Sequence, residues 1–380
     1  MTRADRQVLT GARIFDGDRM WPDGHALELE GDRCFRVVPE SEAEGDRVDL
    51  GGGVLAPGFV DLQVNGGGGL MLNGAPEAAT VARMAEAHAR LGATSILPTL
   101  ITDTLEITRA AIAAVETAVR EGVPGVAGLH LEGPHLDRVR AGAHDPALIR
   151  SMEAADLDLL CAAAGTLPSL IVTLSPGAVS AEQVRALRRA GAIVSLGHSE
   201  ASYDDARAAL DAGAGMVTHL YNAMSPLTHR APGLVGAALD RPVWAGIIAD
   251  EVHVHPAALR VAQAAKPDRL FLVSDAMAVA GTEAQSFELN GRTILRSEGR
   301  LTLADGTLAG ADLDLPRAVR VMHAAGASLE TALSMATARP ADAIERVDLG
   351  RIGKGRRADL CLLDDALHLA GVWQAGVRLI

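Results

Sequence analysis

The stretch IVSLGHS at residues 193–199 is a short apolar run that ends in a glycine and a histidine. Three further runs end in the same manner on an acid or a histidine: LHLEGP at 129–134, MVTHLYNAM at 216–224 and LVSDA at 272–276. Continuous apolar runs of this length, bounded by turn residues, are typical of strands in a parallel sheet that is covered on both faces. The sequence therefore indicates an α/β fold with polar residues at the strand ends.

Eight such runs can be counted, and amphipathic helical stretches separate most of them. The predicted strands are Phe59–Val64, Ser95–Leu100, Val126–Leu131, Leu170–Leu174, Ile193–Leu196, Met216–Leu220, Trp244–Ile248 and Leu270–Val273. Eight strand–helix units fit a closed TIM-type (β/α)8 barrel. The carboxyl ends of the strands form one mouth of such a barrel, so the polar residues that end the runs are expected to meet there. These residues are Glu132, His198, His219 and Asp275.

Capping residues mark the ends of several predicted helices. Ser180 and Gln183 have the spacing of a capping box, and Gly191 closes the same helix. Pro316 is expected at the first position of a later helix, because proline needs no intrahelical hydrogen bond there.

The two ends of the chain have a different pattern from the barrel. Residues 1–54 and 349–380 carry short alternating segments separated by Gly and Asp, which indicate β-strands. We therefore predict a small β-sandwich domain built from both termini, with the barrel at 55–348 inserted between them.

Composition excludes several classes of partner. The formal net charge is −13, with Lys266 and Lys354 as the only lysines, so we expect no nucleic-acid and no membrane partner. An anionic substrate must then meet a local basic pocket. The first residues are polar and no apolar run approaches the ~20 residues of a membrane helix, which predicts a cytoplasmic enzyme. Cys34, Cys161 and Cys361 match no metal or redox spacing and are interpreted as buried small residues.

The residues at the strand ends are those that metal-dependent hydrolysis needs. Glu132, His198 and His219 can hold one divalent ion and leave a position open for water, while Asp275 can move a proton. Either histidine alone would more often be a core or rim residue, and Asp275 alone would more often be a helix N-cap. Their shared position at strand ends favours the site.

Two other histidines lie close to this set in the sequence. His144 follows the Glu132 strand in the loop AGAHDP and could polarise a carbonyl group. His130, two residues before Glu132, is interpreted as a core residue or as a support for the ligands. The glycines at 66–69 match neither phosphate-binding nor dinucleotide-binding spacing, so they carry no functional interpretation.

Several of these segments together resemble one family. They are PGFVDLQVNGGG at 57–68, LHLEGP at 129–134, GAHDP at 142–146, GHS at 197–199, THLYNAM at 218–224 and IIAD at 247–250. In this order they are similar to the N-acetylglucosamine-6-phosphate deacetylases of the amidohydrolase superfamily. The resemblance runs from about residue 50 to the segment GRIGKGRRADL at 350–360.

The resemblance implies hydrolysis of an acetamido sugar phosphate to the amino sugar phosphate and acetate by a homodimeric enzyme. It matches Glu132, His198 and His219 to metal ligands, and Asp275 to the catalytic acid and base, with His144 beside the reacting carbonyl. The positions that match substrate contacts are Ala143, His144, Asn222, Ala223, Arg230, Asp250, Glu251, Val252, His253, Leu308, Ala309 and Gly310. Arg230 and His253 would supply the local positive charge for the phosphate.

Departures from the superfamily pattern refine this expectation. Gln63 and Asn65 stand where many amidohydrolases carry two histidines for a second metal, and neutral amides are poor ligands for zinc or iron. We therefore expect one divalent ion per chain, with zinc favoured and iron or another divalent transition metal as the alternative. Asp312 and Asp314 also look atypical, as does the loop 135–141, and an added carboxylate near the sugar could change which substrate is preferred.

Two alternative functions remain open from the sequence. The substrate could be another acetamido sugar such as N-acetylgalactosamine 6-phosphate, which a comparison of rates on the two epimers would separate. The chain could instead be a catalytically silent barrel that serves as an interaction module. That function predicts the loss of a ligand or of the base, whereas Glu132, His198, His219, Asp275 and His144 are all present.

Overall fold

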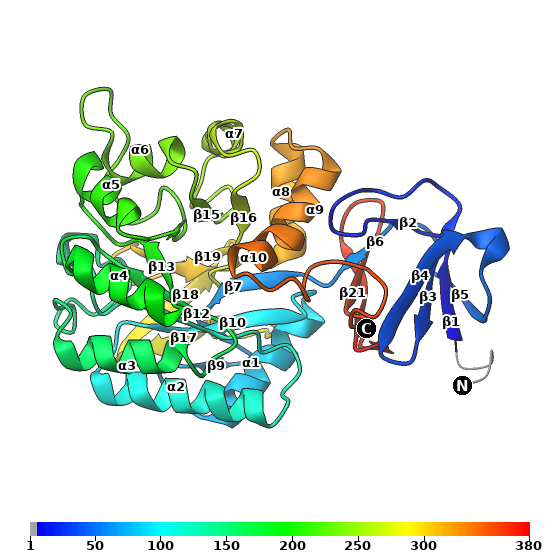
Figure 1. Cartoon of the computed structure of the whole chain (residues 1–380), viewed down its shortest axis with the longest axis horizontal. Coiled ribbons are helices and arrows are strands. Elements are labelled where there is room, and N and C mark those ends of the chain that lie inside the picture. The colour runs from blue at the N-terminus through cyan, green and yellow to red at the C-terminus, as the bar shows by residue number, and fades with distance from the viewer. Residues whose placement is uncertain (1–5) are drawn as a thin grey trace.

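The structure is a computed structural model that describes residues 6–380 (Figure 1). Residues 1–5 of the predicted small β domain lie outside the described part. A barrel surrounded by helices and a smaller β region lie side by side, and the described residues nearest to both ends of the chain lie in the β region (Figure 1). Within residues 6–380, none of the helices combines the length and the apolar character that crossing a bilayer requires.

The barrel contains eight parallel strands, as predicted. In spatial order they are β7 (Val60–Val64), β10 (Ser95–Ile101), β11 (Leu129–Glu132), β12 (Leu170–Leu174), β13 (Ile193–Leu196), β14 (Met216–Val217), β15 (Trp244–Ile247) and β16 (Leu270–Leu272). The sheet closes where the segment after β16 meets β7: the Asp275 amide donates to the Gln63 carbonyl (3.1 Å), and the Asn65 amide donates to the Ala276 carbonyl (2.9 Å). The predicted (β/α)8 barrel is therefore confirmed.

Two of the strands are shorter than expected by more than one residue, for local reasons. β11 begins at Leu129 instead of Val126, because Gly128 has φ +153° and a Cβ there would lie 2.1 Å from the Ser169 carbonyl oxygen. β14 ends at Val217 because the backbone turns into the left-handed region at His219, with φ +30°.

Ten helices of the described residues cover the barrel and its ends. They are α1 (Ala78–Arg90), α2 (Leu105–Arg120), α3 (Ala154–Ala164), α4 (Ala181–Ala190), α5 (Tyr203–Asp211), α6 (Gly233–Asp240), α7 (Pro256–Ala265), α8 (Leu315–Ala324), α9 (Leu329–Ala336) and α10 (Ala338–Ala343). The predicted capping box opens α4, where the Gln183 amide donates to Ser180 Oγ (3.2 Å), and Gly191 ends the helix at φ +99°. Pro316 is the second residue of α8, one position later than expected.

An antiparallel sheet that the sequence did not predict follows the last barrel strand. Its strands are β17 (Ser286–Leu289), β18 (Arg292–Ser297), β19 (Arg300–Thr302) and β20 (Leu308–Ala311). The sheet has its own apolar core, which includes Leu289, Ile294 and Leu301. β20 is joined to the barrel mouth, since the Ala311 amide donates to the Asp275 carbonyl (2.9 Å).

The β region beside the barrel consists of two sheets that combine both ends of the chain. One contains β4 (Arg33–Pro39), β3 (His25–Glu30), β1 (Arg6–Thr10) and β5 (Asp46–Asp49), and the other contains β2 (Arg13–Ile14), β6 (Val54–Pro57), β21 (Leu360–Leu363), β22 (Leu369–Gln374) and β23 (Val377–Arg378). β6 pairs with β21, which links the amino-terminal to the carboxy-terminal segment. The domain boundary at residues 54–55 remains a proposal.

The core of this β region depends on one large side chain, which yields a prediction. Trp373 is 1% exposed and belongs to an apolar cluster with Leu27, Leu55 and Leu360. We expect Trp373→Ala to lower the free energy of unfolding by about 3–5 kcal/mol, because the truncation loses buried area and leaves a cavity. Chemical denaturation measures this loss. Val377→Ala, at a position 64% exposed on the neighbouring strand, is the control and should stay within about 0.5 kcal/mol. Equal effects of the two changes would show that the cluster does not carry the stability.

Candidate metal centre and active site

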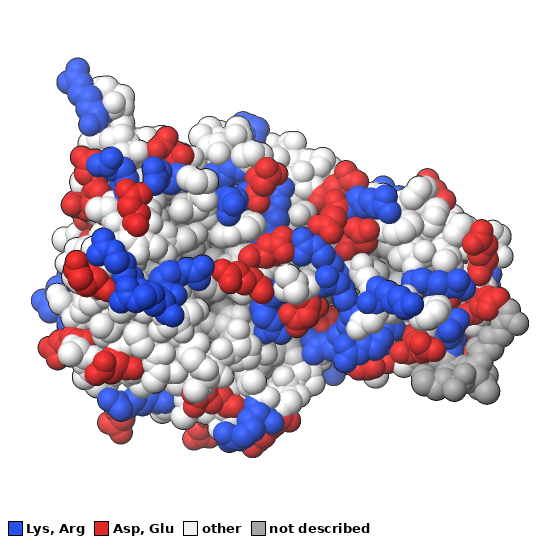
Figure 2. Space-filling model, viewed as in Figure 1, with Lys and Arg blue, Asp and Glu red and all other residues white. Residues whose placement is uncertain are grey.

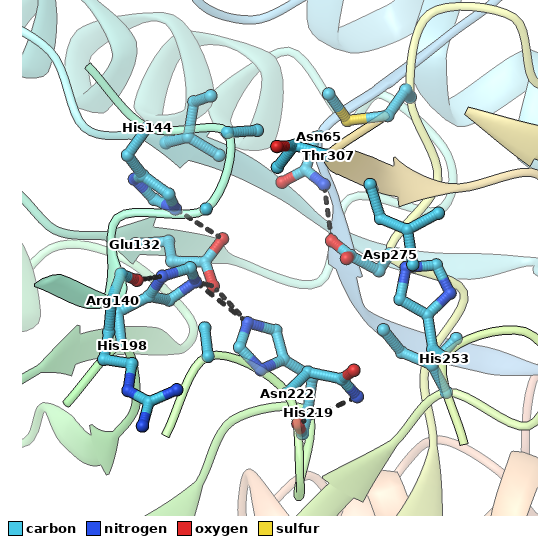
Figure 3. A pocket seen from close by; sticks show the side chains of 18 of the residues that line it. Asn65, Glu132, Arg140, His144, His198, His219, Asn222, His253, Asp275 and Thr307 are labelled. Carbon is cyan, nitrogen blue, oxygen red and sulfur yellow. Dashed lines mark hydrogen bonds and ion pairs between the residues drawn. The ribbon is translucent and has the colours of Figure 1, made fainter. Parts of the chain in front are cut away.

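The four polar residues that end the apolar runs meet at one mouth of the barrel (Figure 3). Glu132 is the last residue of β11, and His198, His219 and Asp275 each follow a strand within three residues. These last three have φ values of +44°, +30° and +51°. Non-glycine residues in this left-handed region cost on the order of 1–3 kcal/mol each and cluster at functional sites.

Glu132, His198 and His219 present three ligand atoms to one point. Glu132 Oε1 lies 2.9 Å from His219 Nε2 and 3.2 Å from His198 Nε2, and the two imidazole nitrogens are 3.0 Å apart. Bonds of about 2.1 Å to a tetrahedral ion would place its ligand atoms roughly 3.4 Å apart. The spacing of the three atoms therefore suits a small divalent cation with a fourth position open.

The hydrogen bond of His198 also fits a metal, whereas His219 Nδ1 is buried without a hydrogen-bond partner among the described residues. His198 Nδ1 donates to the Arg140 carbonyl (2.7 Å), so the neutral ring keeps a lone pair on Nε2. Because the two facing nitrogens and the carboxylate are all electron-rich, a cation among them relieves their repulsion. Burial alone would raise the pKa of Glu132, but its contacts with His198 and His219 hold that pKa well below the usual range.

Asp275 lies across the cavity from Glu132, and the Asn65 amide points at it (Figure 3). A second amide, that of Gln63, also holds Asp275. Its Oδ1 accepts hydrogen bonds from Asn65 Nδ2 (2.7 Å) and Gln63 Nε2 (3.1 Å), and Gln63 Nε2 also lies 3.2 Å from Glu132 Oε1. Burial, with the negative charge of Glu132, raises the pKa of Asp275 to about 6. A carboxyl group with such a pKa can both accept and return a proton near neutral pH.

His144 is fixed as a neutral hydrogen-bond donor. The Thr102 amide donates to His144 Nδ1 (3.2 Å), which places the ring proton on Nε2. Burial, helped by the neighbouring His198, lowers the pKa of His144 to about 3. Its Nε2 lies 3.7 Å from Glu132 Oε2, at the edge of the ligand set.

These residues line a cavity of about 340 Å³. Seven of the twelve positions matched to substrate contacts face it: Ala143, His144, Asn222, Ala223, His253, Leu308 and Gly310. Lining residues that had no role assigned from the sequence are Asn65, Ile101, Val139, Arg140, Gly142, Ile248, Met277 and Thr307. Val139 and Arg140 belong to the loop 135–141, and the atypical sequence of this loop was the signal that could have identified them.

The remaining five positions do not line the cavity. Ala309 is buried between two residues that do, and Asp250 accepts hydrogen bonds from the Val252 amide (2.9 Å), the His253 amide (2.7 Å) and His253 Nδ1 (2.7 Å). Asp250 therefore orients the His253 ring. Glu251 is exposed and Val252 is half-buried beside it.

Arg230 lies on an exposed loop that precedes α6 and projects from the barrel (Figure 1). The turn of this loop is closed by hydrogen bonds between Thr228 and Ala231. No ion pair or hydrogen bond ties the Arg230 guanidinium to another described residue. Arg230 does not line the cavity of its own chain.

The expected influence of Asp312 and Asp314 on the sugar is corrected by the structure. Arg296 forms a bidentate ion pair with Asp312, with two hydrogen bonds of 2.8 Å. Asp314 caps the amino terminus of α8, where its side chain accepts a hydrogen bond from the Arg317 amide (2.8 Å). Neither residue lines the cavity. Arg296, which holds Asp312, belongs to the antiparallel sheet that the sequence did not predict. His130 is buried below the mouth, where it contacts the Leu62 carbonyl and Thr173 Oγ1, in agreement with its interpretation as a core residue.

Comparisons with known proteins agree with this geometry. The model of the amidohydrolase family matches residues 54–378. An N-acetylgalactosamine-6-phosphate deacetylase of Shewanella sp. (strain ANA-3) is 42% identical over 90% of this chain and 86% of its own length. The N-acetylglucosamine-6-phosphate deacetylase of Bos taurus is 37% identical over 97% of this chain and 93% of its own length.

Solved structures are similar over almost the whole chain. The crystal structure of N-acetylglucosamine-6-phosphate deacetylase from Pasteurella multocida has a TM-score of 0.94 at 34% identity and covers 98% of this chain and 99% of that chain. A mutant of the Mycobacterium smegmatis enzyme in complex with N-acetyl-D-glucosamine-6-phosphate has a TM-score of 0.91 at 33% identity, covering 99% and 100%.

The ligand geometry predicts the metal content of the protein. Enzyme purified without added metal should hold about one tightly bound divalent ion per chain, the number for a three-ligand site with an open position. His198→Ala or His219→Ala should lose most of it, whereas Asp275→Asn should retain it. Elemental analysis measures the metal content of the wild type and of the three variants. Full occupancy in both histidine variants would exclude these ligands, and two ions per chain would show that Gln63 or Asn65 supports a second site.

Proposed function

Since the chain belongs to the amidohydrolase family, we propose that it removes the acetyl group from N-acetylglucosamine 6-phosphate, releasing glucosamine 6-phosphate and acetate. One observation carries the proposal: a Glu–His–His ligand set has His144 at its edge and faces Asp275 across one cavity. The activities named for similar proteins at 37% and 34% identity support the substrate.

The ion is proposed to be held by Glu132, His198 and His219, one per chain. Two nitrogen ligands and one oxygen ligand favour zinc, with iron or another divalent transition metal as the alternative. When bound, such an ion would lower the pKa of a water molecule and draw electron density from the acyl oxygen. Gln63 and Asn65 direct their N–H groups at carboxylates, which supports a single ion.

Asp275 is proposed to move the proton of the reaction. Its carboxylate accepts a proton from the attacking water and returns it to the nitrogen of the departing amine, which is a poor leaving group until it is protonated. The hydrogen bonds from Gln63 and Asn65 keep Oδ1 occupied, so Oδ2 is the oxygen left for this transfer.

His144 is proposed to bind the acyl oxygen as negative charge develops on it. Its Nε2–H is a neutral donor fixed by the Thr102 amide, and a fixed donor needs no rearrangement in the transition state. The aliphatic side chains of Ile101, Val139 and Ile248 form part of the wall and limit the water around the reacting group.

N-acetylgalactosamine 6-phosphate is the second candidate substrate. A specific observation favours it, since a deacetylase of that epimer is 42% identical to this chain over 90% of its length. The two sugars differ only in the orientation of one hydroxyl group, and the reaction at the acetamide is the same.

We propose a homodimer in which Arg230 reaches the cavity of the partner copy. The cavity of one chain is lined by only two potentially cationic side chains besides its buried ligand and donor histidines. Arg140 is paired with Glu200, and His253 is hydrogen-bonded to Asp250. A phosphate dianion needs more positive charge than these two side chains supply. The Arg230 guanidinium forms no ion pair or hydrogen bond with another described residue, so its charge is available.

Acetate release from a small panel of sugars tests the reaction. We expect rapid turnover of N-acetylglucosamine 6-phosphate, and much slower turnover of the sugar without phosphate. Higher kcat/KM on the galactose epimer would transfer the assignment to the second candidate. Release of acetate from none of them would overturn the proposal.

The matched control for this panel is Asp275→Asn, which preserves shape but cannot accept a proton. General acid–base catalysis contributes about 10²–10⁴-fold, so the variant should lose kcat on that scale while keeping its metal. More than a tenth of the wild-type rate would exclude the proposed role of Asp275.

Arg230 is tested by complementation between chains. Arg230→Ala should reduce kcat/KM on the phosphorylated sugar by about 10–150-fold and leave the unphosphorylated sugar almost unaffected. Co-expression of Arg230→Ala with Asp275→Asn should restore activity toward about a quarter of the wild-type level, because mixed dimers contain one complete site. Activity no higher than the mean of the two parents would place Arg230 in its own chain's site or outside the site.

A further inference from the structure

A second cavity, of about 560 Å³, lies at the opposite end of the barrel from the active site. Its wall combines the first residue of β10, the loop 123–127 before β11, the segment 346–349 after α10, Arg33 of the small β region and the segment 354–357. β10 spans the distance between the two cavities, since Ser95 lines this one and Ile101 lines the active site. Six strand steps of about 3.3 Å separate them by on the order of 20 Å.

Basic side chains dominate this second cavity, which we call the basic cavity. Five of its lining residues are cationic: Arg33, Arg346, Lys354, Arg356 and Arg357. Of the lining residues, Asp348 is the one acid. Lys and Arg side chains gather over the seam between the barrel and the small β region (Figure 2). The concentration is unusual in a chain whose net charge is −13.

Three of the arginines are held in place by backbone carbonyl groups. Arg33 Nη1 donates to the Gly355 carbonyl (3.3 Å), Arg346 Nη1 donates to the Ala127 carbonyl (3.1 Å), and Arg356 Nη1 donates to the Val347 carbonyl. The carbonyl groups that bind Arg33 and Arg346 are far from them in the sequence, and Val347 lies nine residues before Arg356. The guanidinium groups are therefore positioned before any ligand arrives, which reduces the entropy lost on binding.

Two of the cations form no ion pair with another described residue. Arg346, Arg357 and Arg33 are paired with Asp348, Asp359 and Asp32, respectively. Neither Lys354 nor Arg356 forms an ion pair within residues 6–380, although the charge of Arg356 helps to lower the pKa of Asp348. The nearest recorded contact of the Lys354 ammonium is the ring of Phe35 at 5.8 Å. Lys354 is also one of only two lysines in the chain. Exposed cations usually have no specific role, but here they converge on a concave wall.

We propose that the basic cavity binds a small phosphate-bearing metabolite. Fixed guanidinium groups match the geometry of phosphate oxygens, and an unpaired ammonium adds a point charge. The volume lies within the roughly 300–1,000 Å³ of small-molecule sites. The same chemistry suits inorganic phosphate, a sugar phosphate or a nucleotide, and the distance from the active site leaves substrate access open.

Calorimetric titration of the metal-loaded enzyme tests this site, with inorganic phosphate, glucose 6-phosphate and AMP as separate probes. At least one probe should bind wild-type protein, and Lys354→Glu with Arg356→Glu should weaken that binding by at least about tenfold. The active cavity is unaltered in this variant, so any phosphate bound there is common to both titrations. Tighter binding of AMP would identify a nucleotide site, tighter binding of glucose 6-phosphate a sugar phosphate site, and equal binding of all three a phosphate site.

The matched control changes the same charge on another face. Arg185→Glu with Arg189→Glu alters two exposed residues of α4 and should leave the binding of each probe close to that of wild type. Lys354→Ala alone provides a milder variant, because this exposed side chain makes no hydrogen bond that the fold requires. Deacetylation kinetics should be unchanged in all these proteins. Equal weakening in the α4 control, or binding that is the same in wild type and both Lys354 variants, would overturn the proposal.

Discussion

The closure of the barrel between β7 and the segment after β16 determines where the active site forms. The backbone hydrogen bonds from Asp275 to Gln63 and from Asn65 to Ala276 join the first strand to the last. Because these same residues carry the amide and carboxylate side chains of the mouth, the bonds that close the sheet also bring the base against its two amide donors. The left-handed turns at His198, His219 and Asp275 are tolerated within this closed frame.

The charge balance of the mouth explains why a cation belongs there. Glu132 and Asp275 are both buried and both accept hydrogen bonds from the side-chain NH2 group of Gln63, while His144 is held neutral. Two buried carboxylates raise each other's pKa unless positive charge lies nearby. A divalent ion held by the proposed ligand Glu132 would supply that charge, and Asp275 would stay outside the ligand set, where it could exchange a proton. The different roles proposed for the two acids thus follow from a difference of a few ångströms in their positions.

The two cavities use positive charge in different ways, although the chain as a whole is acidic. The active cavity has few basic side chains, which supports contribution of Arg230 from a second copy. The basic cavity collects its arginines from three parts of the sequence and fixes them through carbonyl groups. In both cases short-range geometry, and not the net field of the protein, governs the encounter with an anion.

The sequence by itself determined the eight-stranded barrel and the three residues that form the proposed metal site. Apolar runs and the residues that end them are local features, and parallel strands in a barrel must place their carboxyl ends together. Only the tertiary structure decided the roles of residues whose partners lie far away in the sequence. Asp312 meets Arg296 through an unpredicted sheet, Arg230 projects from the barrel, and Lys354 joins Arg33 and Arg346 in one wall. Such contacts depend on how whole elements pack, which neither hydrophobic periodicity nor motif spacing records.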